Sequence, residues 1–191
     1  MKSVFIYILC LFSIDQVQSQ TAHFLSNPTL TPDGQFTIFA FEGDLWRVSS
    51  DGGRALRLTA MQGYETSPRV SPDGKWIAFT GRQFGNGDIF IIPSQGGEVR
   101  QISFHSGNDE VTSWSWDSRY IYFNSSREGQ VSGYKVSIQG ETAKRVFGDY
   151  FFQYDHNLVE HPSTGEIFFN NTWESSNQVA RKRYKGPFNP D

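Results

Sequence analysis

The chain of 191 residues contains 17 Lys and Arg against 20 Asp and Glu, so its formal net charge is −3. A slightly acidic chain gives no electrostatic argument for nucleic acid or an anionic membrane surface as a partner. Aromatic residues make up 16% of the chain and glycine accounts for 18 residues, a mixture of ring-bearing and turn-forming residues that favours an all-β protein.

Residues 1–19 have the features of a secretory signal peptide. Lys2 precedes an apolar run over residues 4–14, and Val17 and Ser19 occupy the −3 and −1 positions of a cleavage site. The run is too short to cross roughly 30 Å of hydrocarbon, so we expect cleavage near Ser19–Gln20 and no membrane span. The sequence therefore predicts an exported chain, periplasmic or extracellular, whose mature part contains no cysteine and no disulfide framework.

A three-part pattern recurs along residues 20–191. Its first part is a strand, a tight turn and a second strand, with the turn written Pro-Asp-Gly at 32–34 and 72–74, Trp-Asp-Ser at 116–118 and Ser-Thr-Gly at 163–165. Proline fixes φ at the first corner of such a turn, and glycine accepts a positive φ at its end. The second part is a short strand ("DLWRV", "DIFII", "GYKV"), and the third is a hairpin turn into a basic strand ("DGGRALRLT", "QGGEVRQIS", "QGETAKRVF").

The spacing of this pattern is that of a β-propeller. Gly52, Gly96 and Gly140 lie 44 residues apart, and four strand signals fall within each period. We predict an all-β, partial β-propeller of about three and a half four-stranded blades. The blades are expected at 23–62, 63–106, 107–150 and, incomplete, 151–191.

The second strand of each blade is apolar at odd and even positions alike, as in "KWIAFT" and "RYIYFN". A strand packed on one face would alternate, whereas the middle strand of a propeller blade is covered on both faces. The sequence thus predicts that six rings are buried between blades: Phe36, Phe39, Trp76, Phe79, Tyr120 and Phe123.

Residues that could carry chemistry have plainer explanations. "GQVSG" at 129–133 lacks the spacing and the strand–turn–helix context of a nucleophile elbow. His156 and His161 are five apart on a strand–turn segment, which would place their side chains on opposite faces of a strand and not around one metal ion. Asp33, Asp73 and Asp117 are expected to hold turns. We therefore assign no catalytic, cofactor-binding or metal-binding residue and expect no cofactor.

The basic residues of each blade's fourth strand are expected at the outer edge of the sheet, where charge discourages pairing with other chains; a partner-binding rim is the alternative. The dense basic run Arg181–Gly186 favours a solvated strand or loop. Asn124 and Asn170 match glycosylation acceptors, which matter only in a eukaryotic secretory host.

"SPDGKWIAFTGRQFGNGDIFIIPSQGGEVRQIS" resembles the TolB-like repeat of periplasmic propellers. The ordered series "GDLWRVSSDGGRALRLT", "SPRVSPDGKWIAFTG", "GDIFIIPSQGGEVRQIS" and the terminal "RKRYKGPFNPD" resembles the N-terminal propeller of tricorn-type proteases. The resemblance implies a six-bladed propeller followed by a second propeller, a PDZ-like domain and a serine peptidase domain. It also implies that residues 20–191 are an N-terminal fragment ending in blade four.

The function expected from this resemblance is non-catalytic: substrate access or assembly in an exported tricorn-like serine peptidase. Its implied partners are peptide or protein substrates and the remaining propeller and peptidase domains, with a homo-oligomer as a further possibility. Two alternatives stay open. One is a free-standing TolB-like scaffold that binds proteins at the cell envelope, and the other is the N-terminal propeller of a prolyl-oligopeptidase-like enzyme or an amidohydrolase.

Overall fold

The computed structural model of the chain describes residues 25–147 and 157–169, and all regular structure in these two ranges is β. No helix there is long and apolar enough to cross a membrane. The predicted signal peptide lies outside the described residues.

Three four-stranded antiparallel sheets follow one another along the chain, each with its strands in sequence order. Blade one contains β1 (Ser26–Leu30), β2 (Phe36–Phe41), β3 (Asp44–Ser49) and β4 (Leu56–Arg57). Blade two contains β5 (Glu65–Val70), β6 (Trp76–Gly81), β7 (Asp88–Pro93) and β8 (Arg100–Gln101). Blade three contains β9 (Asp109–Trp114), β10 (Tyr120–Ser125), β11 (Ser132–Ser137) and β12 (Lys144–Arg145).

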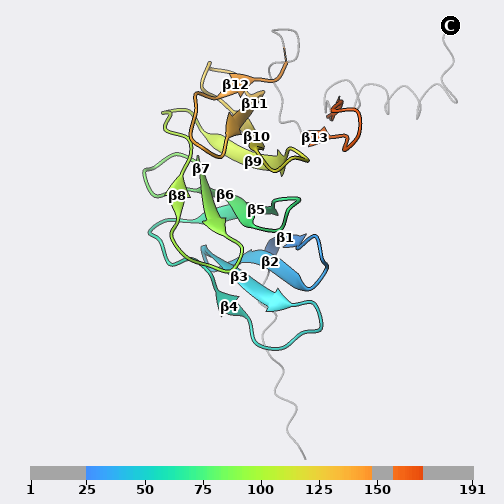
Figure 1. Cartoon of the computed structure of the whole chain (residues 1–191). Helices are drawn as coiled ribbons and strands as arrows, with labels where there is room; N and C mark the ends of the chain where they lie inside the picture. Colours follow the sequence, from blue (N-terminus) through green and yellow to red (C-terminus); the bar gives the residue numbers. More distant parts are fainter. Residues whose placement is uncertain (1–24, 148–156, 170–191) are drawn as a thin grey trace, which may run out of the picture.

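A two-stranded sheet of β13 (Val159–Glu160) and β14 (Ile167–Phe168) follows blade three. Figure 1 shows the blades side by side in chain order, with β13 near β9. The prediction of an all-β, partial propeller is confirmed.

The hydrophobic core is divided between the two junctions of neighbouring blades. At the junction of blades one and two, the core comprises Ile38, Ala40, Leu45, Ile77, Phe79, Phe90 and Ile92. The core between blades two and three comprises Ala78, Ile89, Ile91, Ile102, Val111, Trp114, Ile121, Phe123, Tyr134 and Val136. Neighbouring residues of β6 thus serve different cores, Ile77 and Phe79 on one side and Ala78 on the other. This arrangement explains why the second strands are apolar at successive positions.

The predicted burial of the six rings holds for three of them. Phe39, Phe79 and Phe123 are buried, whereas Phe36, Trp76 and Tyr120 are only partly buried, which corrects the prediction. The reason is position, because each of the latter three is the first residue of its strand, next to a turn.

Each of these three partly buried rings has a cation over its face instead of a full apolar cover. Arg47 lies 4.7 Å from the ring centroid of Phe36, Arg100 lies 5.9 Å from that of Trp76, and Lys135 lies 5.2 Å from that of Tyr120.

The first strands of neighbouring blades contact one another and form the inner edge of the arc. These strands are bulged, with register shifts at Asn27, Ser67 and Thr112. Pro28 and Pro68 follow the first two bulged positions and lack a backbone N–H. Bulges and prolines interrupt an edge, so the inner edge is poorly suited to accept an added strand.

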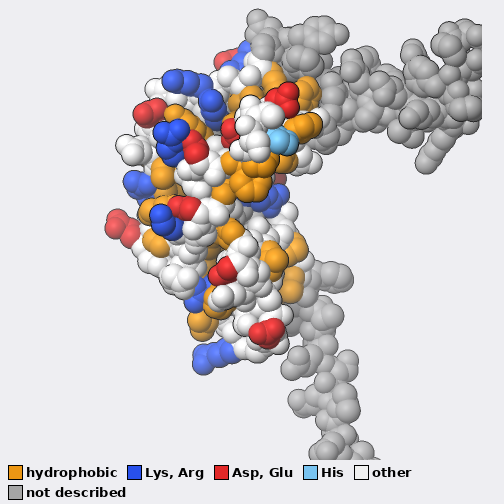
Figure 2. All heavy atoms as spheres, turned by 45° about the vertical axis from the view of Figure 1, so that its right-hand side comes forward, with side chains coloured by type: hydrophobic (Ala, Val, Ile, Leu, Met, Phe, Trp, Pro, Cys, Tyr) orange, Lys and Arg blue, Asp and Glu red, His pale blue; other side chains and the backbone are white. Residues whose placement is uncertain are grey.

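At the other edge lie β4, β8 and β12, each two residues long, and they carry Arg57, Arg100 and Lys144–Arg145. The expected placement of the basic fourth strands at the outer edge is therefore observed. In the view of Figure 2, basic and acidic side chains are interspersed along one flank of the arc.

The segment 157–169 is held against blade three by its first residues. Leu158 is fully buried, and Gly133 leaves room for it, since a Cβ at Gly133 would lie 2.9 Å from Leu158 Cδ1. The indole Nε1 of Trp116 donates to the carbonyl oxygen of Glu160 at 2.5 Å, and the Glu160 carboxylate accepts from the Tyr122 hydroxyl at 3.5 Å. Burial and this carboxylate raise the pKa of Tyr122 to about 12.

Candidate functional site

The turns between the first and second strands all lie on one face of the arc, which we call the turn face. Each turn is closed by the same pair of side chains. In blade two, the Ser71 hydroxyl donates to Asp73 Oδ1 at 2.6 Å, and the same carboxylate oxygen accepts from the Lys75 N–H at 3.1 Å. Thr31 with Asp33, and Ser115 with Asp117, repeat these contacts in blades one and three.

The three turn aspartates are thus stabilised as carboxylates. Hydrogen bonds from Thr31 and the Gln35 N–H lower the pKa of Asp33. For Asp73 and Asp117, partial burial opposes the shift, but hydrogen bonds from the turn residues outweigh it and lower the pKa. Groups that lose their protons this readily are poor proton donors near neutral pH, which supports the predicted role of these aspartates in the turns.

The turn glycines have the positive φ that the sequence predicts, +72° at Gly34 and +71° at Gly74. In blade three Ser118 takes this place with a φ of +59°, and its hydroxyl accepts a hydrogen bond at 3.0 Å from the Asp73 N–H of blade two. The turns of neighbouring blades therefore touch.

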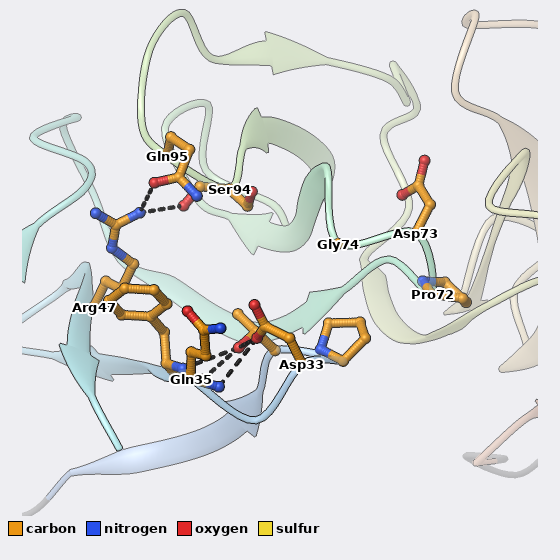
Figure 3. A pocket seen from close by; sticks show the side chains of 11 residues that line it. Asp33, Gln35, Arg47, Pro72, Asp73, Gly74, Ser94 and Gln95 are labelled. Carbon is orange, nitrogen blue, oxygen red and sulfur yellow. Dashed lines mark hydrogen bonds between the residues drawn. The ribbon is translucent and has the colours of Figure 1, made fainter. Parts of the chain in front are cut away.

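A cleft of about 290 Å³ opens on the turn face between blades one and two (Figure 3). Its walls are the two Pro-Asp-Gly turns and the turn between β7 and β8, and its lining residues are Thr31, Pro32, Asp33, Gln35, Phe36, Arg47, Pro72, Asp73, Gly74, Ser94 and Gln95.

Arg47 crosses this cleft from β3. Its guanidinium donates to the Ser94 carbonyl oxygen at 3.1 Å and to Gln95 Oε1 at 2.5 Å, so it ties blade one to blade two (Figure 3). Arg47 was not among the basic residues singled out from the sequence, because it belongs to a third strand and no motif marks it. The cleft thus offers carboxylates, amides and a guanidinium that is already hydrogen-bonded, groups suited to holding a polar or charged chain.

The opposite face of the arc, the loop face, carries the connections between second and third strands and between blades. At each junction two buried carboxylates meet there: Asp44 with Glu65, and Asp88 with Asp109. The second pair repeats the first, because Asp88 and Asp109 lie 44 residues after Asp44 and Glu65.

A hydroxyl belongs to each carboxylate pair: Thr59 donates to Glu65, and Ser103 donates to Asp88 at 3.4 Å. Each pair also has one arginine. Arg57 Nη2 lies 2.6 Å from Asp44 Oδ2, and Arg127 Nη2 lies 2.9 Å from Asp109 Oδ2.

One carboxyl group of each pair has a raised pKa. Burial raises the pKa of Glu65, and the Asp44 carboxylate adds to the rise. Burial likewise raises the pKa of Asp88, with the neighbouring Asp109 adding to it. The period itself was the sequence signal for these pairs, because acidic residues recur at equivalent positions next to the loops.

The raised pKa of Glu65 predicts a pH-dependent stability. A raised folded-state pKa contributes stability that is fully present below the unfolded value, near 4.5, and is lost as pH rises through the folded value. The Glu65→Gln variant should lose this part of the slope, which is at most about 1.4 kcal/mol per pH unit for one proton. Urea unfolding of the two proteins between pH 4.5 and 8 measures it.

The turn aspartates do not affect the slope in this window. Their lowered folded-state pKa values contribute stability that is fully present above the unfolded value of 3.8 and is lost only as pH falls below it. Glu98→Gln, an exposed change in the turn between β7 and β8, is the matched control and should keep the wild-type slope. Parallel pH profiles for wild type and Glu65→Gln would show that Glu65 does not titrate in this way.

The remaining candidates from the sequence have structural roles wherever they lie within the described residues. His161 Nδ1 accepts from the Ser163 and Thr164 N–H groups at 3.2 Å, so it caps its own turn. Ser132, the serine of "GQVSG", is buried in β11 and accepts from Arg145 at 3.1 Å. Asn124 is buried in β10, where a glycan would not fit. His156, Asn170 and Arg181–Gly186 lie outside the described residues. No cluster of three metal-ligating side chains occurs within 25–147 and 157–169.

A family model described as the tricorn protease N-terminal beta propeller domain matches residues 22–191. The chain belongs to this family. A putative tricorn-like protease N-terminal subunit of Sulfurisphaera tokodaii is 30% identical over 138 residues, which cover 67% of this chain and 70% of that protein. Tricorn protease homolog 1 of Streptomyces coelicolor is 34% identical over 103 residues, 53% of this chain but only 9% of the homologue.

The fold of this tricorn-type propeller is also that of TolB. The TolB structure from Acinetobacter baumannii superposes with a TM-score of 0.63 at 18% identity, covering 77% of this chain and 43% of TolB. A likeness at this identity concerns the fold alone. The tricorn-type propeller therefore shares its scaffold with TolB, and the scaffold alone does not determine its role.

Proposed function

We propose that this chain is a non-catalytic propeller of an exported tricorn-type serine peptidase, serving substrate access or the assembly of its parts. The observation that carries the proposal is the match of residues 22–191 to the N-terminal propeller of that family. The Sulfurisphaera relative supports assembly in particular, because it is described as a subunit of a tricorn-like protease.

The contacts of the described residues fit this role. The turn aspartates close turns, His161 caps its own turn, and Arg47 joins blades one and two, so these side chains stabilise the scaffold. What the scaffold presents to other molecules is the cleft on the turn face, the loops of the opposite face and the inner edge, surfaces of the kind on which propellers bind partners.

The experiment compares two forms of the protein expressed in full, together with any residues that follow 191 in its gene: the intact chain and a variant lacking residues 25–169. A role in access predicts that the deletion changes the ratio of cleavage rates for long and short peptides. A role in assembly predicts that the deletion abolishes the assembled species in size-exclusion chromatography. Purified intact chain with no peptidase activity, alone or in complex, would contradict the proposal.

Export is the second part of the proposal and rests on residues 1–19. N-terminal mass analysis of protein recovered from the exported fraction should give a chain beginning at or near Gln20. An intact Met1 in that fraction would show that the segment is not cleaved.

A TolB-like scaffold is the second candidate function. It is favoured by a stretch of 66 residues that is 38% identical to a TolB homolog of Chlorobium luteolum, although this covers only 34% of the chain and 15% of that protein. Co-purification of the intact chain with envelope proteins in the absence of peptidase activity would favour this candidate.

A further inference from the structure

Three aromatic rings are strongly exposed on neighbouring loops of the loop face. Tyr64, Phe84 and Phe104 have 67%, 71% and 76% of their surface exposed. Hydrogen bonds join their loops: the Arg82 N–H donates to the Tyr64 carbonyl oxygen at 3.1 Å, and the Asn86 amide donates to the His105 carbonyl oxygen at 2.8 Å. The three loops that carry the rings therefore adjoin one another across both blade junctions.

The repeat does not require these rings. The residue 44 positions after Tyr64 is Asn108, the residue 44 positions after Phe84 is Glu128, and the residue 44 positions before Phe104 is Ala60. By contrast, Phe79 and Phe123 recur at the same spacing and are buried. Single exposed rings are common on protein surfaces, but large exposed rings gathered on adjoining loops, without a role in the repeat, point to contact with another molecule.

The loops that carry the rings are held in place before any partner arrives. The Asn86 amide also donates to the Gly107 carbonyl oxygen at 3.1 Å, and Asn108 Oδ1 accepts from the Gly87 N–H at 3.0 Å. Gly63 lies so close to Arg82 that a Cβ there would be 2.7 Å from the Arg82 carbonyl oxygen. Rigid loops lose little conformational entropy on binding, so rings mounted on them make efficient contacts.

The chemistry of the three loops selects the kind of partner. Residues 59–64, 82–87 and 103–108 contain a single charged side chain, Arg82, when His105 is neutral, and several neutral amides. Aromatic rings carry no charge and pack well on apolar side chains. The exposed Gln62 has an amide that can hydrogen-bond a polypeptide backbone.

We propose that the surface formed by Tyr64, Phe84 and Phe104 binds extended, uncharged segments of polypeptide rich in apolar side chains. The inference rests on the proposed function, and it names the class of segment that this propeller would receive. It places substrate contact on the loop face and not in the charged cleft of the turn face.

The test uses the full chain and a fluorescein-labelled unfolded protein, reduced and carboxamidomethylated α-lactalbumin, followed by fluorescence anisotropy. The double variant Phe84→Ser with Phe104→Ser should weaken the Kd at least tenfold, because aromatic anchors dominate such contacts. Leu56→Ser is the control: Leu56 is 49% exposed on β4, at the outer edge, and its loss should leave the Kd unchanged. Both variants should retain the wild-type Tm.

Three results would overturn the inference: a wild-type chain that does not bind the probe, a double variant that binds it as tightly as wild type, or equal weakening by Leu56→Ser. Binding of a soluble oligosaccharide such as chitohexaose, lost in the double variant while the polypeptide is ignored, would assign the surface to glycans instead. The double variant should still form the assembled species of the intact protease. Failure of the surface is then distinguishable from failure of the proposed function.

Discussion

Replacing Arg127 with methionine should destabilise the chain by about 3–5 kcal/mol, the usual cost of leaving a buried charge without its partner. The Asp109 side chain is fully buried, and its Oδ2 lies 2.9 Å from Arg127 Nη2. Asp88 is close enough for Asp109 to raise its pKa, so loss of the guanidinium leaves two acidic groups facing each other. The free energy of unfolding in urea at pH 7 measures the loss.

Arg119→Met is a matched control for this change. Arg119 pairs with Asp117 at 2.6 Å, but the two side chains are 73% and 43% exposed, and pairs exposed to solvent in this way contribute little to stability. We therefore expect only a small change in the free energy of unfolding for this variant. Adding Asp109→Asn to Arg127→Met should restore part of the stability, since the uncompensated charge is then removed. Equal losses for Arg127→Met and Arg119→Met would show that burial of the pair does not determine its contribution.

Phe79→Ala should cost about 3–5 kcal/mol of unfolding free energy, through lost burial and the cavity that remains. Phe79 is fully buried between blades one and two, and its ring stacks on Phe90 with centroids 5.7 Å apart. Few side chains of the partner blade can move into the space, because Ile38 and Leu45 are themselves fully buried. Thermal and urea unfolding both report the change.

Phe84→Ala makes the same chemical change on the loop face, where the ring is 71% exposed, and should alter stability by no more than about 0.5 kcal/mol. A similar loss in both variants would mean that the exposed ring has a packing role. That result would also weaken the case for Phe84 as a contact for another molecule.

Much of the fold was predictable because it depends on local chemistry repeated along the chain. Gly34 and Gly74 in the turns, and Gly52 and Gly96 in the hairpins, have the positive φ that these turn types need. The apolar second strands likewise reflect a requirement that each blade meets in the same way. Phe36, Trp76 and Tyr120 were predicted to be buried but are only partly buried. The repeated pattern shows that an aromatic residue is present, but it does not show how close that residue lies to the end of its strand.

The surfaces could not be predicted in the same way, because they depend on contacts between blades. Arg47 in β3 reaches Ser94 and Gln95, which lie more than 40 residues away in the sequence. Glu65 and Asp44 meet only because consecutive blades stack. Tyr64, Phe84 and Phe104 could be singled out only after their exposure was known, since sequence alone does not separate an exposed ring from a buried one.

Ser118 makes a contact between turns that depends on the order of the blades. Where blades one and two end their turns with glycine, blade three has a serine whose hydroxyl holds the Asp73 N–H of the blade before it. A glycine there would fit the turn equally well but would recognise no neighbour. The repeats are consequently not interchangeable. If the second and third blades were exchanged in the gene, each blade could still form its own sheet, but the hydrogen bond between the turns of neighbouring blades would be lost. The replacement of glycine by serine at this one turn position thus favours the native order of the blades.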